Sequence, residues 1–227
     1  MKSILRRLRD RVFAGLARQQ DLDRLYGQIS GLLQIQNAMQ GKSVLRPMRG
    51  WAISPDAMAW LLADLQERKS STVIEFGSGQ STVVLASYLQ NRNGGRLISV
   101  EHDPEYLAHI QRQTAACGLS DRIQFFHAPL KQAGDNIQCP SYDLDVLPDV
   151  AIDLALVDGP PISNGIFTRL KPLQWAVRHL KPGGVVFLDD SAREVEQACL
   201  KQLKTEHPAL RIVPRTAEKG LVELRLD

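Results

Sequence analysis

The chain has 227 residues, a net charge of +3 and a composition, 44% hydrophobic and 23% charged, that is typical of one or two globular domains. This composition excludes a collagen-like fibre, an intrinsically disordered chain and a disulfide-rich scaffold. Cys117, Cys139 and Cys199 form no CxxC pair, so we expect no disulfide framework, no cysteine zinc site and a cytoplasmic location. No apolar run reaches the ~18 residues of a membrane span. Arginines interrupt the N-terminal apolar residues, unlike in a signal peptide.

Residues 1–40 read as a helical leader whose first half is basic. Six basic residues and one acid give residues 1–20 a charge of +5, which leaves −2 for the remainder of the chain. We therefore expect no nucleic-acid-binding surface on the body of the protein. A weak contact with an anionic membrane surface would involve residues 1–20.

A heptad seam predicts a coiled coil within this leader. Apolar residues repeat at intervals of three and four between residues 22 and 39, interrupted only at Gln36. Gly27 and Gly31 weaken so short a helix, so it should pack on the body or on a second copy, as a homodimer. Upstream apolar residues lie in another register, which predicts a helix break near residues 15–20. The seam consists of Leu22, Leu25, Ile29, Leu32 and Met39.

A connector and a folded domain follow the leader. Residues 41–53 are rich in Gly, Pro and basic side chains, and residues 54–227 form the predicted domain. Ser54 followed by Pro55 is typical of a helix N-terminus and predicts a helix over residues 55–67. The connector is either a plain linker or a segment that closes over a cleft with Arg46, Arg49 and Trp51.

Strands and helices alternate through most of this domain. Strands separated by helices need right-handed crossovers, which predicts a doubly wound α/β fold with a mostly parallel sheet covered on both faces. The predicted strands are residues 72–76, 96–101, 123–127, 153–158 and 185–189. The predicted helices are residues 80–90, 104–117, 165–180 and 192–206.

The C-terminal end departs from this alternation. Residues 211–214 and 221–226 both read as strands, and residues 215–220 between them are too few for a crossover, which takes about a dozen. We therefore predict an antiparallel hairpin, which gives one edge of the parallel sheet a reversed strand.

Gly77 and Gly79 follow the first predicted strand and lead into a helix. Glycines let the backbone approach a ligand, and a helix N-terminus offers unpaired N–H donors. Thr82 stands where the dinucleotide fingerprint GxGxxG needs glycine, and the Glu75 carboxylate would repel a pyrophosphate. The pattern favours S-adenosylmethionine, which carries a sulfonium and no phosphate. A tight turn without a ligand is the alternative.

Glu101 ends the second predicted strand, 22 residues beyond Gly79. A carboxylate at this position can accept hydrogen bonds from both ribose hydroxyls of an adenosine cofactor, in NAD as well as in S-adenosylmethionine. Asp103, followed by Pro104, is typical of a helix N-cap.

Carboxylates follow two central strands that we expect to be neighbours. Asp158 ends the fourth predicted strand, and Asp189 and Asp190 end the fifth, at the edge where open α/β sheets bind ligands. We predict that these three aspartates are catalytic, one of them as general base, or that they hold Mg²⁺ or another divalent cation. Since successive side chains on a strand alternate, Asp189 and Asp190 share the cleft only if the strand has ended. His127, after the third strand, is a further candidate base.

Four segments, taken together over residues 54–227, resemble the class I S-adenosylmethionine-dependent methyltransferases: VIEFGSGQST, SVEHDPEY, DLALVDGPP and LKPGGVVFLDD. The chain is similar to the bacterial branch that acts on small molecules and polysaccharides, in which a helix like the one begun by GWAISPD precedes the glycine loop. The resemblance implies a Rossmann-like, seven-stranded sheet with an antiparallel last strand. The cofactor-binding residues that it implies are Glu75, Gly77, Ser78, Gly79, Ser81, Glu101, His102 and Asp158.

By position, the resemblance implies that Glu75, Gly77 and Gly79 hold the methionine part of the cofactor and that Glu101 holds the ribose. His102 would lie beside the adenine, and Asp158 would face both cofactor and acceptor.

The chain departs from the family at several positions. Ser81 occupies the place of a third glycine, and His127 ends the third strand without the acid that often contacts adenine. The three aspartates resemble the metal carboxylates of catechol-type O-methyltransferases, but Pro161 stands where those enzymes carry a lysine. Their general base therefore does not transfer to this chain.

We expect O-methylation of a hydroxyl on a small molecule or a glycan. Two alternatives are an NAD-dependent oxidoreductase and a non-catalytic interaction protein that uses the leader helix.

Overall fold

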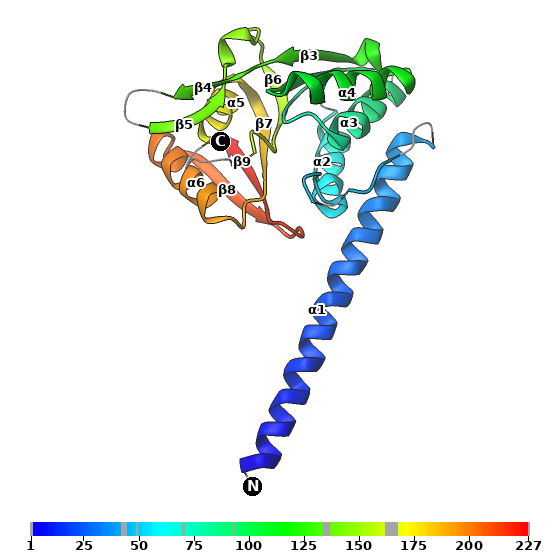
Figure 1. Ribbon diagram of the computed structural model, residues 1–227, viewed down its shortest axis with the longest axis vertical. Coiled ribbons are helices and arrows are strands. Elements are labelled where there is room, and N and C mark those ends of the chain that lie inside the picture. The colour runs from blue at the N-terminus through cyan, green and yellow to red at the C-terminus, as the bar shows by residue number, and fades with distance from the viewer. Residues whose placement is uncertain are drawn as a thin grey trace.

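The computed structural model describes residues 2–41, 45–48, 50–69, 71–92, 94–133, 137–161 and 168–226. It shows a layered α/β body from which one long helix projects (Figure 1). The predicted doubly wound fold is confirmed, because a mostly parallel seven-stranded sheet lies between two groups of helices.

The leader is a single helix, α1 (Lys2–Met39). The predicted break near residues 15–20 is wrong. A change of apolar register moves the apolar stripe around a helix without interrupting its backbone, and the segment is rich in Ala, Arg and Gln, which favour helix. Within the described part of the chain, no helix combines the length and the apolar character needed to cross a membrane.

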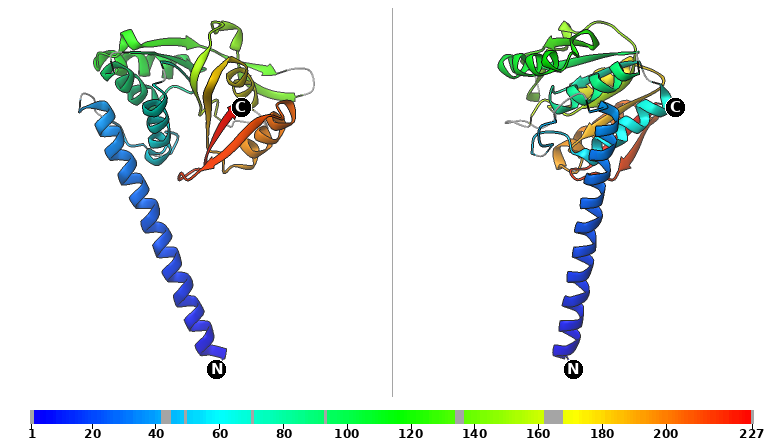
Figure 2. Two further views of the ribbon diagram at one scale, coloured as in Figure 1. Left: turned by 180° about the vertical axis from the view of Figure 1, so that it is seen from behind. Right: turned by 90° about the vertical axis from the view of Figure 1, so that its right-hand side faces the viewer.

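The C-terminal end of α1 docks on the body through its glycine face. A Cβ atom on Gly31 would lie 2.3 Å from the Pro55 carbonyl oxygen, so only glycine allows the helices to approach this closely. Ile35 and Met39, one and two turns further on, are fully buried. The N-terminal half of α1 stands clear of the body in every view (Figures 1 and 2). The seam residues Leu22, Leu25, Ile29 and Leu32 remain 44% to 55% exposed.

The main sheet has the strand order β3-β2-β1-β6-β7-β9-β8. All neighbours are parallel except β9, which is antiparallel to both β7 and β8. The strands are β1 (Thr72–Phe76), β2 (Arg96–Glu101), β3 (Ile123–His127), β6 (Ile152–Val157), β7 (Leu180–Asp189), β8 (Leu210–Arg215) and β9 (Leu221–Leu226).

The C-terminal hairpin and its reversed strand, β9, are confirmed. β9 lies beside β7 at the end of the parallel strands, and β8 forms the outer edge of the sheet. Four of the six residues of β9 are therefore buried, whereas the side chains of β8 are mostly accessible. Pro214, which lacks an N–H donor, lies on the edge strand β8, where such a residue is tolerated.

Helices cover both faces of the sheet and enclose two apolar clusters. The end of α1, α2 (Pro55–Arg68), α3 (Gln80–Asn91) and α4 (Pro104–Ala116) cover one face. The other carries α5 (Leu170–His179) and α6 (Glu194–Glu206). The predicted start of α5 at residue 165 lies outside the described residues. Short 3-10 turns occupy Ser120–Arg122 and Leu144–Val146.

A second, small hairpin of β4 (Leu130–Ala133) and β5 (Ile137–Tyr142) was not predicted from the sequence. It follows β3 and brings Tyr142, which is almost fully buried, to the carboxyl end of the main sheet. This is the edge of the sheet where the predicted site residues gather.

Candidate active site

A cavity of about 620 Å³ opens at the carboxyl ends of β1, β2, β6 and β7. Its volume lies in the range of small-molecule sites, roughly 300–1,000 Å³. The ends of four strands meet here, so the sites predicted at separate strand ends share one cavity. The lining residues are Gly50–Ile53, Gly77–Ser81, Glu101–Asp103, Tyr106, Tyr142, Asp158, Gly159, Pro161, Arg169, Asp190 and Arg193.

The glycine loop after β1 needs glycine at its first position. Gly77 has a φ of +102°, and a Cβ atom there would lie 3.1 Å from the Gly159 backbone nitrogen. The Gly77 N–H donates a hydrogen bond to the Val100 carbonyl at 2.9 Å. This hydrogen bond ties the loop to β2, and the absence of a side chain on Gly77 lets the loop lie against the one that follows β6. Gly77, Ser78, Gly79 and Ser81 all line the cavity, where the resemblance places the cofactor.

Glu75 lies beneath this loop and is fully buried rather than part of the cavity wall. Its carboxylate accepts hydrogen bonds from the hydroxyls of Ser81 and Ser99, each at 2.7 Å. Burial raises the pKa of Glu75 to about 7, against the lowering effect of these hydrogen bonds. In this geometry Glu75 supports the glycine loop from behind.

Glu101 reaches the cavity wall from the end of β2. Its Oε1 accepts from the backbone N–H groups of His102 at 2.7 Å and Asp103 at 2.9 Å, and its Oε2 accepts from the Ser78 N–H at 3.1 Å. His102 Nδ1 lies 2.6 Å from Oε1, and this hydrogen bond raises the pKa of His102. The carboxylate is therefore fixed in position between the glycine loop and the end of β2.

His102 lies in the cavity wall beside Tyr142, with their ring centroids 6.1 Å apart. The predicted N-cap role of Asp103 is confirmed, because its carboxylate accepts from the N–H groups of Glu105 and Tyr106. His127, the further candidate base, bonds the His102 carbonyl through Nε2 at 3.0 Å and does not line the cavity.

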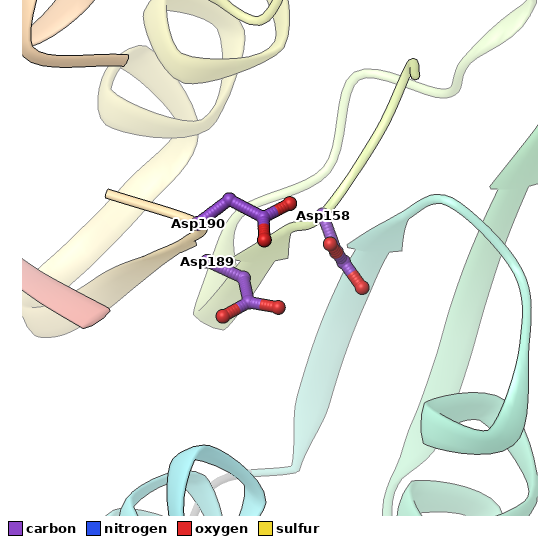
Figure 3. A group of neighbouring side chains, drawn as sticks. All are labelled: Asp158, Asp189 and Asp190. Carbon is purple, nitrogen blue, oxygen red and sulfur yellow. The ribbon is translucent and has the colours of Figure 1, made fainter. Parts of the chain in front are cut away.

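The three predicted aspartates come together at the ends of β6 and β7 (Figure 3). β7 ends at Asp189, and Asp190 has a left-handed φ of +57°, which turns its side chain into the cavity. Asp158 also lines the cavity, whereas Asp189 is fully buried behind it. Burial and the neighbouring Asp189 charge raise the pKa of Asp158 well above its usual range. Burial likewise raises the pKa of Asp189.

Besides Arg193, which follows Asp190 by three residues and pairs with it, two cations that the sequence analysis missed face these aspartates. Arg169 is 3% exposed, and its Nη2 lies 3.0 Å from Asp190 Oδ2. Lys219 Nζ lies 3.0 Å from Asp189 Oδ2 and 3.3 Å from Asp190 Oδ1. Each is separated from the aspartates by ten or more residues, so no local motif signals the pairing. The Lys-Gly turn of the predicted hairpin was the single available signal for Lys219.

These cations bear on the predicted divalent ion. The carboxylate oxygens that would coordinate Mg²⁺ already face a guanidinium and an ammonium group. As they stand, the residues do not fit a metal site without displacement of Lys219.

The connector forms part of the cavity wall. Residues 50–53 line it, and the Trp51 side chain is 83% exposed at its mouth. The Arg46 backbone N–H donates to the Gln80 side chain at 3.1 Å, and position 49 lies outside the described residues. α2 begins at Pro55 as predicted, but the Ser54 hydroxyl makes no capping hydrogen bond.

Comparison with known proteins decides the family. Residues 74–191, just over half of the chain, match the protein family described as "Methyltransferase domain". The chain belongs to this family. It is a class I S-adenosylmethionine-dependent methyltransferase, as the resemblance implied, and the alternative of an NAD-dependent oxidoreductase is set aside.

One curated relative of the methyltransferase is a catechol O-methyltransferase from Niastella koreensis. The two are 26% identical over 153 residues, which is 63% of this chain and 59% of the relative, so less than two thirds of the relative is matched.

Solved structures share the fold. The SAH-bound Podospora anserina methyltransferase PaMTH1 superposes with a TM-score of 0.61 and 17% identity, over 86% of this chain and 88% of that one. An O-methyltransferase from Bacillus cereus in complex with SAH gives 0.60 and 17%, over 86% and 90%. At these identities the likeness establishes the Rossmann-like methyltransferase fold.

Proposed function

We propose that the methyltransferase moves the methyl group of S-adenosylmethionine to a hydroxyl oxygen of a small molecule or a sugar. The observation that carries the proposal is the position of Asp158. Its backbone meets Gly77 of the glycine loop, and its carboxyl group clusters with that of Asp190, the ion-pair partner of Arg193. We assign the glycine-loop half of the cavity to the donor and the half that Trp51 and Arg193 line to the acceptor. The name of the Niastella koreensis relative, a catechol O-methyltransferase, supports oxygen as the atom methylated.

The glycine-loop half suits the adenosyl donor. Gly77 keeps the backbone free of a Cβ atom, and Glu101 presents Oε2 with one described donor, the Ser78 N–H, so it can accept a further hydrogen bond from a ribose hydroxyl. His102 and Tyr142 offer ring surfaces for a base to pack against. We therefore retain Glu101 for the ribose and His102 for the adenine.

The reaction needs little covalent chemistry from the protein. The acceptor oxygen attacks the methyl carbon, the carbon–sulfur bond breaks, and its electron pair stays on the sulfur of S-adenosylhomocysteine (SAH). Holding donor and acceptor in line lowers the barrier by up to about 7–11 kcal/mol. Asp158 takes the hydroxyl proton, a contribution of roughly 10²–10⁴ in rate. Asp190 sits beside it, and Asp189 supports both from behind.

The acceptor half is open and carries an aromatic face and a cation. Trp51 is 83% exposed, and Arg193 is 43% exposed beside Asp190. An exposed indole suits the apolar face of a sugar or of an aromatic ring. Because residues 50–53 belong to this wall, we assign them to the catalytic unit together with the predicted domain of residues 54–227.

We further propose a homodimer through α1. The exposed seam residues Leu22, Leu25, Ile29 and Leu32 have the spacing of a coiled coil, and a helix without a partner is marginal in water. A second copy presents the same seam, so it satisfies the pattern by symmetry. Weak contact of residues 1–20 with a membrane surface is the competing use of this helix.

Calorimetry tests the proposed donor. We expect S-adenosylmethionine and SAH to bind and NADH to leave no heat signal. Glu101→Ala should weaken SAH binding at least about tenfold, the cost of roughly one charge-assisted hydrogen bond. Glu105→Ala, which removes an exposed carboxyl at the start of α4, is the matched control. Binding of NADH in place of SAH would refute the proposal.

Methyl-transfer assays on a panel of glycans and hydroxylated metabolites test the acceptor class. With an acceptor in hand, Asp158→Asn should lower kcat by about 10²–10⁴ while SAH affinity changes little. An unchanged kcat would remove Asp158 from the role of base.

A further inference from the structure

Four carboxyl groups converge at the ends of β6 and β7, and three cations are placed among them. Glu196 of α6 joins the three aspartates, and its Oε1 lies 3.5 Å from Arg169 Nη1. Arg193 Nη1 lies 2.8 Å from Asp190 Oδ2. A buried carboxylate without a counter-charge is costly, so these pairs explain how the fold tolerates the cluster. The cations are Arg169, Arg193 and Lys219.

The Lys219 ammonium group has three oxygen neighbours. Its Nζ donates a hydrogen bond to the Ala52 carbonyl at 3.1 Å and forms ion pairs with Asp189 and Asp190. These oxygens belong to the connector, to β7 and to the turn after β7, so several parts of the fold fix the position of Lys219.

The terminal hairpin places Lys219 there. Its turn is tied to the end of β7, because the Ser191 N–H donates to the Gly220 carbonyl at 3.2 Å and the Ala192 N–H to the Lys219 carbonyl at 3.3 Å. Gly220 has a φ of +79°, and a Cβ atom there would lie 2.6 Å from the Ala192 nitrogen. Only glycine therefore lets the turn approach closely enough.

Arg169 is just as fully engaged. Its Nη1 donates to the Asp189 carbonyl and its Nη2 to the Asp158 carbonyl, each at 2.9 Å, besides the Asp190 carboxylate. It therefore connects the ends of β6 and β7 beside the three aspartates.

We propose that Lys219 and Arg169 are built-in counter-ions that take the place of a divalent cation, and that the protein binds its methyl donor without a metal ion. The inference concerns the site of the proposed function and rests on it for the identity of the donor.

Charge complementarity supports this reading. The four carboxyl groups of the cluster already have three cations beside them, so a divalent cation would have to compete with these built-in positive charges for the carboxylate oxygens.

Cation titrations of the whole protein test the proposal. Mg²⁺ and Mn²⁺ are titrated by calorimetry, and Tb³⁺ by luminescence sensitised by Trp51 at the cavity mouth. We expect no saturable binding to the wild type and equal SAH affinity with and without a chelator. Lys219→Met should create a site at the aspartates that binds Mn²⁺ at least about tenfold more tightly than the wild type.

Control variants test whether the new cation site depends on the loss of the Lys219 charge and on the aspartates. Lys219→Arg keeps the charge and should bind no cation. Lys181→Met removes a lysine that lies 3.0 Å from Asp153, away from the cavity, and should also bind none. Adding Asp189→Asn to Lys219→Met should abolish the new site.

Stoichiometric Mg²⁺ or Mn²⁺ binding by the wild type, lost in Asp189→Asn, would overturn the inference even if Lys219→Met does not fold. So would a folded Lys219→Met that binds no cation, because Lys219 would then not be what excludes the metal. Failure of SAH to bind at all is a separate outcome, which refutes the proposed function and leaves the cation result to stand on its own.

Discussion

The hydroxyl of Ser81 donates a hydrogen bond to the carboxylate of Glu75 at 2.7 Å, directly beneath the glycine loop. Ser99 makes the same contact from β2. Glu75 therefore connects the start of α3 to the neighbouring strand while remaining out of contact with the cavity. The protonation state of Glu75 therefore bears on the hydrogen bonds that hold the glycine loop in place.

Glu75→Gln should stabilise the protein at high pH. Because burial raises the folded-state pKa from 4.5 to about 7, the folded protein holds an extra proton between these values. Stability therefore falls as pH rises through this window, by a total on the order of 3 kcal/mol. Glutamine is always neutral, so the variant should have the higher Tm at pH 8 and a Tm close to the wild type at pH 5.

Thermal unfolding across this pH range measures the effect. Glu105→Gln, at an exposed position, is the control and should follow the wild-type profile. If Glu75→Gln and the wild type lose stability in parallel as pH rises, another group is responsible for the pH dependence.

Gly77→Ala should damage the loop, whereas Gly79→Ala should not. Gly77 has a φ of +102°, and a Cβ atom added there would lie 3.1 Å from the Gly159 nitrogen. Alanine at this position should therefore add backbone strain of about 1–3 kcal/mol. Gly79 has an extended φ of 178°, and its nearest neighbour would be Tyr106 Oη at 3.8 Å. Urea unfolding of the two variants provides the comparison, and equal losses would show that the conformation of Gly77 is not the cause.

The docking of α1 provides a second pair of glycine substitutions. A Cβ on Gly31 would meet the Pro55 carbonyl at 2.3 Å, so Gly31→Ala should push the helix away and cost about 1–3 kcal/mol. On Gly27 it would lie 3.9 Å from Asp56 Cβ, and Gly27→Ala should gain about 0.5–1 kcal/mol from helix propensity. The two changes should shift the free energy of unfolding in opposite directions, and shifts of the same sign would contradict this account.

The fold was predictable because its signals are local. Apolar strands between helices, and two strands too close for a crossover, specify a doubly wound sheet with a terminal hairpin. The acids at the ends of β6 and β7 were predictable for the same reason, since Asp158 directly follows β6 and Asp189 and Asp190 stand at the end of β7. The left-handed conformation of Asp190 then turns its side chain into the cavity. The strand has ended before Asp190, which is the condition that the sequence analysis set for this residue to face the cleft.

What escaped prediction depends on contacts between distant segments. Lys219 reaches the aspartates only because β9 pairs with β7, and this pairing of distant segments is a property of the whole sheet that no local pattern specifies. Arg169 follows a segment without a periodic pattern. On α1 the whole apolar seam was the obvious packing surface, yet of the seam only Met39 is buried, and the closest approach to α2 is made at Gly31, where the absence of a side chain allows it. Small residues carry no hydrophobic signal in a sequence.

The seam that docking leaves exposed yields the last prediction. Leu25 is 55% and Ile29 50% exposed, so we expect their replacement to disturb the docking of α1 on the body little. In a coiled-coil dimer the same residues face their counterparts, and the double change Leu25→Asp and Ile29→Asp would place four carboxylates in the interface. We expect a dimer for the wild type and a monomer for this variant in sedimentation velocity, with an unchanged affinity for SAH. Gln34→Asp, which adds a charge to an exposed position outside the seam, should remain dimeric. A wild type that is monomeric but binds vesicles with anionic lipid would assign the helix to the membrane surface instead.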